Sequence, residues 1–215
     1  MRGLAIVVCA LAAAVPVLGA ELVVNPGFES GDLAPWVQWG PGWGGSGPVA
    51  VQSVTVYEGS YAAEIPLNTN EGSYGFKQLV DVPSNTPLTF SCYVNAPNPG
   101  TNWAEVLLFP DAVVDDNNID SGDLSKPFMI WKRDSWTGVP GLPGGTLPTV
   151  DALGDEGWEK VTGTISSSTG TVTIAFKWGG FVTGSMLVDG VSLTPEPASL
   201  LILLAGLPLL GRSRR

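Results

Sequence analysis

The feature that most constrains the fold of this chain is the alternation of apolar and polar residues over 88–94. Leu88, Phe90, Cys92 and Val94 take every second position of this segment. Because successive side chains of a strand point to opposite faces, the alternation predicts a strand with one buried face. Similar short apolar runs recur between glycines and prolines, and no window outside the two termini has a helical period, which predicts an all-β sandwich or barrel. The expected strands cover residues 22–24, 49–57, 61–65, 75–82, 88–94, 104–109, 158–165, 172–178 and 186–193.

The last expected strand contains a slip in its alternation. Met186 and Val188 are two residues apart and share one face, whereas Val191 and Leu193 lie one residue out of this alternation. An extra residue in one strand of an antiparallel pair is a β-bulge, which re-aims the side chains beside it. The slip therefore predicts a bulge at Asp189-Gly190 and a redirected Asp189 side chain.

The chain contains few side chains of the types that commonly act in catalysis. The chain has no histidine, and Cys92 is the only cysteine outside the apolar N-terminal run. The absence of histidine removes the commonest general base and every arrangement in which histidine activates a serine or cysteine. Cys92 has no partner for an intramolecular disulfide, and its strand phase predicts a buried structural thiol. These observations favour a protein that is not an enzyme.

The N-terminus has the composition of an export signal. A basic start at Met1-Arg2 precedes an apolar run over 4–18, and small residues lead up to Ala20. This order is typical of a secretory signal peptide, which we place at residues 1–20.

The C-terminus combines a proline-flanked acid, an apolar run and a basic end. The run over 198–211 has 14 residues, so a helix there would span about 21 Å, against about 30 Å for the core of a bilayer. The basic end predicts that the arginines stay on the cytoplasmic side of a weak membrane anchor. This part of the chain is Pro195, Glu196, Pro197, the apolar run, Arg212, Arg214 and Arg215.

That order of parts over 195–215 resembles the PEP-CTERM sorting signal, which a membrane enzyme of the exosortase type cleaves in Gram-negative bacteria. The resemblance implies a secreted protein that is transiently anchored in the membrane and then reaches the cell envelope or extracellular surface. It also implies an exosortase-type sorting enzyme as a partner. An ordinary tail anchor is the alternative interpretation.

The remaining segment, 21–194, is strongly acidic. It keeps six of the ten basic residues and nineteen of the twenty acidic ones, which gives a net charge of −13. Binding to nucleic acid requires a basic surface, so nucleic acid is not an expected partner. Divalent cations and neutral polymers are compatible with this charge.

The segment 21–194 opens with Asn-Pro-Gly-Phe-Glu at 25–29 and Trp36, and further landmarks follow in order at 58–62, 78–80, 87–91, 158–164 and 187–193. Together they resemble the carbohydrate-binding jelly rolls attached to cellulases and xylanases. The resemblance implies a jelly-roll β-sandwich of two antiparallel sheets that binds a polysaccharide or exopolysaccharide without catalysis. The insertion at about 110–155 has no counterpart in the family and is expected to be irregular. A structural protein of the cell surface or extracellular matrix with the same fold is the alternative, and an enzyme of unknown type is a third.

The same resemblance implies a structural Ca²⁺ between the first and last strands. Calcium takes about six to eight oxygen ligands, from carboxylates and backbone carbonyls. The family positions correspond to Glu29 and Asp189 here, while Gly27 and Tyr61 could add carbonyl oxygens and Glu58 a further carboxylate. The alternative is that Glu29 is a turn carboxylate and Asp189 a bulge residue.

A second acidic group lies inside the insertion. Asp116, Asn118 and Asp120 fall at the first, third and fifth positions of an EF-hand loop. The required glycine comes one place late at Gly122, and the twelfth position holds Pro127 instead of glutamate. We therefore expect a solvated acidic loop and not a second calcium site.

Eight tryptophans supply the candidate sugar platforms. Trp36, Trp158 and Trp178 are assigned to the core by family position or strand phase. An exposed indole stacks on the apolar face of a sugar ring, and nearby carboxylates and amides bind its hydroxyls. The alternative is that the loop tryptophans pack a long loop onto the sheet. The platform candidates are Trp39, Trp43, Trp103, Trp131 and Trp136, and the polar candidates beside them are Asn70, Glu71, Asn102 and Glu105.

Overall fold

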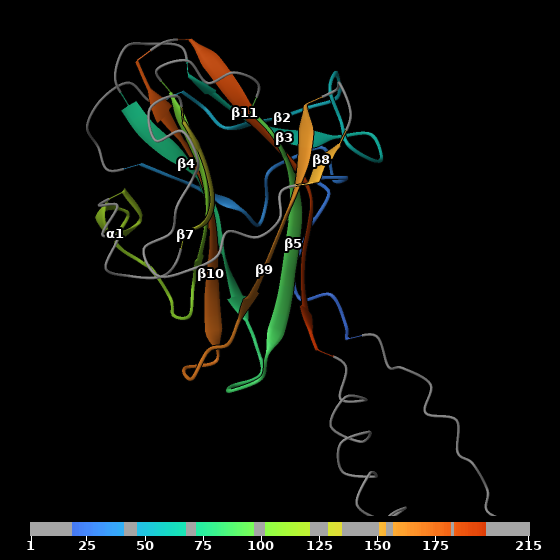
Figure 1. The fold of residues 1–215 in the computed structure, drawn as a ribbon, viewed down its shortest axis with the longest axis vertical. Coiled ribbons are helices and arrows are strands. Elements are labelled where there is room, and N and C mark those ends of the chain that lie inside the picture. Colours follow the sequence, from blue (N-terminus) through green and yellow to red (C-terminus); the bar gives the residue numbers. More distant parts are fainter. Residues whose placement is uncertain are drawn as a thin grey trace, which may run out of the picture. The chain divides into compact units, whose positions relative to one another are not determined.

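The computed structural model describes residues 19–40, 47–67, 72–96, 102–120, 129–134, 151–153, 157–181 and 183–196. Within the compact unit Ala20–Pro195, these residues form two antiparallel sheets that pack face to face (Figure 1). The predicted all-β sandwich is confirmed. The five-stranded sheet has the order β1 (Val37–Trp39), β4 (Gly72–Asp81), β10 (Thr171–Gly180), β6 (Trp103–Phe109) and β7 (Met129–Asp134). The six-stranded sheet has the order β2 (Ala50–Gln52), β3 (Ala62–Leu67), β11 (Gly184–Pro195), β5 (Leu88–Asn95), β9 (Trp158–Ile165) and β8 (Asp151–Leu153).

Most predicted strands occur, and two predictions of local structure were wrong. β9 has the predicted bounds and β5 is one residue longer. β2 is much shorter than 49–57, because the Gln52 side chain accepts hydrogen bonds from the Val54 and Thr55 amides and turns the chain. No regular strand forms at 22–24, where the Leu22 amide donates to the Leu193 carbonyl.

The predicted bulge in β11 is confirmed. The pairing of β11 with β5 shifts register between Asp189 and Ser192. The extra residue lets Val188 and Val191, on either side of the slip, both lie in the core. Gly190 has a φ of +54°, a left-handed conformation that glycine adopts without a steric penalty.

The centre of the core is aromatic. Phe176 of β10 lies 4.9 Å from Phe76 of β4 and 5.8 Å from Trp36, measured between ring centroids. Phe28 completes the group, at 5.8 Å from Phe76 with the rings edge to face. Cys92 is also fully buried, and burial raises the pKa of its thiol well above the usual value. The predicted burial of Trp36, Trp158 and Trp178 is confirmed.

The insertion at 110–155 is more ordered than predicted. Its described residues include the short helix α1 (Asn117–Asp120), strand β7, which extends the five-stranded sheet beside β6, and strand β8 at the edge of the other sheet. In Figure 1, α1 lies on the side of the five-stranded sheet that faces away from the six-stranded sheet.

Most of the predicted terminal signals lies outside the described residues, from 1 to 18 and from 197 to 215. Pro195, which was expected to open the tail, is the last residue of β11 and pairs with Leu88. Within the part of the chain that the structure describes, no helix has the length and apolar character needed to cross a bilayer.

Candidate functional site

The segment 110–120, called the strap below, covers part of the outer face of the five-stranded sheet. The outer face is the side that points away from the six-stranded sheet. Val113 and Ile119 of the strap belong to a small apolar cluster that is separate from the main core. The sheet contributes Trp39, Leu107, Phe109 and Ala175 to this cluster.

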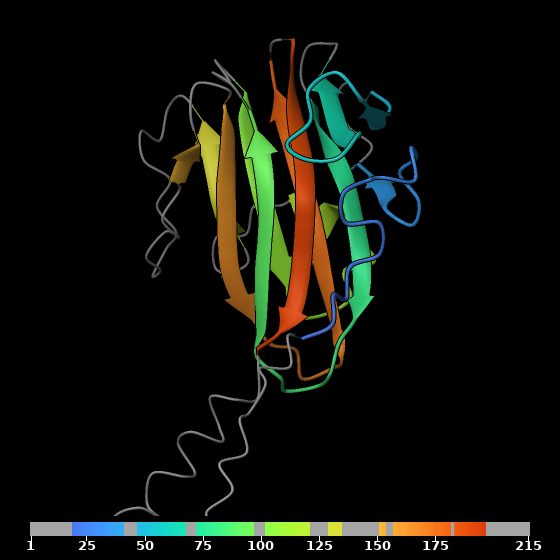
Figure 2. The same cartoon turned by 90° about the vertical axis from the view of Figure 1, so that its right-hand side faces the viewer.

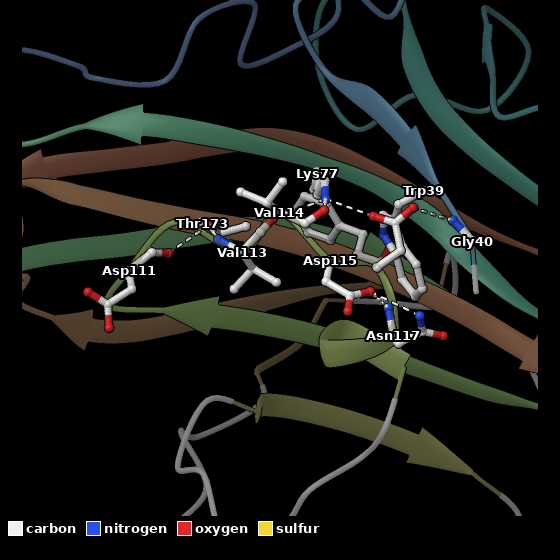
Figure 3. Close-up of polar contacts among 11 residues, drawn as sticks. Trp39, Gly40, Lys77, Asp111, Val113, Val114, Asp115, Asn117 and Thr173 are labelled. Carbon is white, nitrogen blue, oxygen red and sulfur yellow. Dashed lines mark hydrogen bonds and ion pairs between the residues drawn. The ribbon is translucent and has the colours of Figure 1, made fainter.

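Polar contacts fasten the strap to the sheet (Figure 3). The Lys77 ammonium of β4 donates to the carbonyls of Val113 and Val114 at 3.1 and 3.3 Å, and it lies 2.7 Å from a carboxylate oxygen of Asp116. The second oxygen of Asp116 accepts from the Gly40 amide at 3.3 Å. Thr173 of β10 accepts from the Val113 amide at 2.9 Å through its hydroxyl.

The acidic side chains of the strap that the structure describes, those of Asp111, Asp115 and Asp116, are therefore engaged in structure. The expectation of a solvated acidic loop was wrong for Asp116, which is paired with Lys77. Asp115 accepts from the backbone and side-chain nitrogens of Asn117 at 3.0 and 2.9 Å. In the described segments as a whole, no group of three or more histidine, cysteine, aspartate or glutamate side chains is placed to hold a metal ion.

Two of the predicted sugar platforms are buried, and their prediction was wrong. Trp39 is 2% exposed and its indole N–H donates to the Phe176 carbonyl at 3.2 Å, so it packs in the cluster with the strap. Trp131 is also 2% exposed, and its indole N–H donates to Glu159 at 3.3 Å. Trp43 and Trp136 lie outside the described residues.

Of the three predicted platforms that the structure describes, Trp103 keeps partial exposure. A side-chain carbon built on Gly179 would lie 2.5 Å from the Trp103 ring, so the missing side chain of Gly179 lets the indole lie against β10. The Phe181 ring, which is 49% exposed, lies 6.0 Å away at an interplanar angle of 66°. Sequence reasoning missed Phe181, although its position directly after Gly179-Gly180 at a strand end was a usable signal.

The two polar residues that were predicted beside this tryptophan and that the structure describes are not available to a ligand. Glu105 lies one strand repeat away and pairs with Lys177 at 3.2 Å, and both side chains are 5% exposed. Asn102 is buried, and its side-chain amide oxygen accepts a hydrogen bond from the backbone amide of Phe181 at 3.0 Å. Their assignment to sugar hydroxyls was wrong, because Glu105 is engaged by Lys177 and Asn102 holds the backbone of Phe181. Asn70 and Glu71 lie outside the described residues.

A second candidate site lies where β11 meets the loop 57–61. Asp189 is fully buried, and its carboxylate accepts from the amides of Tyr57, Glu58 and Gly190 at 2.9, 3.1 and 2.7 Å. Burial raises the pKa of this carboxyl, the three amide donors oppose the rise, and the nearby Glu58 carboxylate adds to it. The site therefore holds a carboxylate whose negative charge is incompletely compensated.

Glu29 reaches the same loop from the other end of the domain. Its carboxylate accepts from the amides of Ser60 and Tyr61 at 3.0 and 3.1 Å. A side-chain carbon built on Gly27 would lie 3.7 Å from an oxygen of Asp189 and 4.0 Å from an oxygen of Glu29. The two carboxylates thus flank the space beside Gly27.

The five residues implied as calcium ligands meet at this corner of the molecule. Glu58 belongs to it as well, because its carboxylate lies 3.4 Å from a side-chain carbon built on Gly190. Carboxylate oxygens are the hard donors that Ca²⁺ prefers, and the remaining ligands of such an ion would be backbone carbonyls and water. Together with Glu58, the acids do not form a group of three placed around one ion, so a calcium ion here would depend on Glu29, Asp189, backbone carbonyls and water. We call this group, made of Gly27, Glu29, Glu58, Tyr61 and Asp189, the carboxylate corner.

Comparison with known proteins identifies the architecture. No protein-family model matches the chain, and no curated protein matches it either. Among solved structures, the chain is similar to TmCBM61 in complex with beta-1,4-galactotriose, with a TM-score of 0.50 and 17% identity over 82% of this chain and 99% of that chain. It is also similar to the CBM22-1 xylan-binding domain of Paenibacillus barcinonensis Xyn10C, with a TM-score of 0.47 and 19% identity over 84% of this chain and 97% of that chain. The fold is the jelly roll of carbohydrate-binding modules.

Proposed function

We propose that this protein is a non-catalytic carbohydrate-binding protein whose ligand site is the aromatic pair Trp103 and Phe181. The observation that carries the proposal is that a partly exposed indole and a half-exposed phenyl ring lie 6.0 Å apart at one end of the five-stranded sheet. Their faces can cover the apolar C–H faces of sugar rings, which is a recurring use of exposed aromatic side chains.

The surroundings of the pair support binding and not catalysis. A glycosidase uses two carboxyl groups about 5 to 9.5 Å apart across an accessible glycosidic bond. Among the described side chains, the carboxylate nearest in sequence to Trp103 is that of Glu105, which is buried and paired with Lys177. The net charge of −10 favours an uncharged ligand. TmCBM61 has been solved in complex with β-1,4-galactotriose, which makes this trisaccharide the first probe to test.

Replacing both rings, as Trp103→Ala with Phe181→Ala, should weaken glycan binding by roughly 5- to 150-fold, since each aromatic contact contributes roughly 0.5–1.5 kcal/mol beyond its buried area. A glycan array followed by affinity electrophoresis measures the change. Val54→Ala is the matched control, because Val54 is an apolar residue with 91% exposure on another loop. Unchanged affinity in the double variant would move the site elsewhere, and a parent protein that binds no glycan would favour a structural surface protein.

We also propose that the carboxylate corner holds a structural Ca²⁺. Support comes from the convergence of Glu29 and Asp189 on the space beside Gly27 and from the buried charge of Asp189. An ion that binds only the folded state stabilises that state by about 2.7 kcal/mol when its free concentration is a hundred times its dissociation constant. EDTA should therefore lower the Tm by several degrees at pH 7, and excess Ca²⁺, but not Mg²⁺, should restore it. A Tm that EDTA leaves unchanged would remove Ca²⁺ from this corner.

We propose further that residues 1–20 direct export and that residues 195–215 direct sorting to the cell envelope or extracellular surface of a Gram-negative-type bacterium. Support comes from the order of proline, acid, apolar run and arginines in the tail. The mass of the mature protein should show that the chain begins near residue 21 and ends near residue 196. In cells without the exosortase-type enzyme the tail should remain, and a tail that is lost in those cells would contradict sorting by that enzyme.

A further inference from the structure

The outer face of the six-stranded sheet carries an ordered array of hydroxyl groups. In the register of β9, β5 and β11, Thr89 pairs with Thr164 on one side and Thr194 on the other. One strand repeat further along, Ser91 pairs with Thr162 and Ser192 in the same way. We call these two sets the hydroxyl rows. They comprise Thr164, Thr89 and Thr194 in the first row and Thr162, Ser91 and Ser192 in the second.

The hydroxyl rows are accessible and chemically unused. Thr89 and Thr164 are exposed, and the other four residues are half-exposed. None of the six side-chain hydroxyls hydrogen-bonds to another residue in the described structure. Figure 2 shows β9, β5 and β11 side by side and facing the viewer. A ligand can therefore reach the rows without displacing any of their contacts.

An aromatic pair lies beside the second hydroxyl row, two residues further along β5. Tyr93 of β5 is stacked on Tyr57, with 3.5 Å between ring centroids and 15° between planes. Lys160 of β9 lies 5.6 Å from the Tyr93 ring centroid. Both tyrosines are half-exposed and add a flat apolar surface to the polar rows.

The chemistry of this face selects among possible occupants. The two rows contain no charged residue, and the whole chain has a net charge of −10, so a nucleic acid or an acidic peptide finds no complementary basic surface. An apolar protein surface would bury the hydroxyls without partners, at a cost of about 1–3 kcal/mol for each group. A neutral polyhydroxyl chain matches the absence of charge. It also pairs with hydroxyls that both donate and accept.

We propose that the outer face of β9, β5 and β11 is a second glycan-binding surface. A neutral polysaccharide lies along the strands, hydrogen-bonded to the hydroxyl rows, with one sugar ring against the pair of Tyr57 and Tyr93. The distance from the first row to the tyrosines is four residues, or about 13 Å at strand spacing. This surface and the pair of Trp103 and Phe181 belong to different sheets, so the two sites bind independently and one molecule can bridge two chains of a polymer.

The test uses the full-length purified protein and two variants of this face. The row variant carries Thr89→Val and Thr164→Val, which remove two hydroxyls at nearly constant shape. The aromatic variant carries Tyr57→Ala, which keeps the Tyr57 amide that donates to Asp189. Thr183→Val, at an exposed residue of the β10–β11 loop, is the matched control. The probes are β-1,4-galactotriose and an uncharged, insoluble β-1,4-galactan.

Each variant of this face should reduce retention on the insoluble polymer by about tenfold, while the control retains it and all Tm values stay close to the parent. The loss of retention should add to the loss from the Trp103→Ala/Phe181→Ala variant.

Unchanged retention in both the row variant and the aromatic variant overturns the proposal for this face. The proposed function still stands in that case if the Trp103→Ala/Phe181→Ala variant loses binding. Retention lost only through the row and aromatic variants supports this face and overturns the other site. Absence of binding by the parent protein overturns both. Concentration-dependent dimerisation that the row variant abolishes, with retention on the polymer unchanged, overturns only the proposal for this face.

Discussion

Replacing Phe176 by alanine should lower the free energy of unfolding by about 3–5 kcal/mol, which is the usual range for removing a buried phenyl ring. Phe176 is fully buried between Phe76 and Trp36, on the central strand of the five-stranded sheet. The surrounding rings belong to β4 and to the segment before β1, so no single element can move to fill the cavity. For a domain of this size the Tm should fall by roughly 6–20 °C.

Phe181→Ala is the matched control for this substitution. It removes the same ring from a site that is 49% exposed, so it should change the free energy of unfolding by less than about 1 kcal/mol. Chemical unfolding followed by tryptophan fluorescence measures both variants. Equal losses in the two would contradict the placement of Phe176 at the centre of the core.

Replacing Asp189 by alanine should cost about 2–4 kcal/mol, because it leaves the amides of Tyr57, Glu58 and Gly190 without their acceptor. The loop 57–61 should then detach from β11, and its amide hydrogens should exchange faster. If the carboxylate corner holds Ca²⁺, the variant should also lose the stabilisation by that ion. Unfolding in urea with and without Ca²⁺ separates the two contributions.

Asp81→Ala is the control for Asp189, since Asp81 is an exposed carboxylate on β4. It should leave both the stability and the response to Ca²⁺ within about 0.5 kcal/mol of the parent. An Asp189→Ala protein that is as stable as the Asp81→Ala protein would show that the buried carboxylate is not needed to hold the loop.

The strands were the most predictable part of the fold. β5 follows from the alternation over 88–94, and the bulge at Asp189-Gly190 follows from a one-residue slip, because side-chain direction in a strand is a local property. The exception was β2, where the Gln52 side chain replaces strand pairing with bonds to the next two amides. A side-chain hydrogen bond of that kind does not change the pattern of apolar residues, so the pattern could not predict where β2 ends.

The candidate sites were predictable only in part. The resemblance of 25–29 and 187–193 to a known family pointed to residues that do meet at the carboxylate corner. Exposure of Trp39 and Trp131 could not be predicted in the same way, since both are covered by segments distant in sequence. The strap over the five-stranded sheet depends on the buried Lys77, whose partners lie 36 to 39 residues later.

By itself the sequence determined which segments are strands, which of their faces are apolar and where β11 slips, because these depend on neighbours within a few residues. Only the tertiary structure decided which strands are paired, which loops cover the sheets and which aromatic residues remain exposed. These features depend on contacts between residues far apart in the chain. The hydroxyl rows illustrate the difference, since each of their residues is an ordinary polar position in its own strand. They form a surface only because β9, β5 and β11 lie side by side in one register.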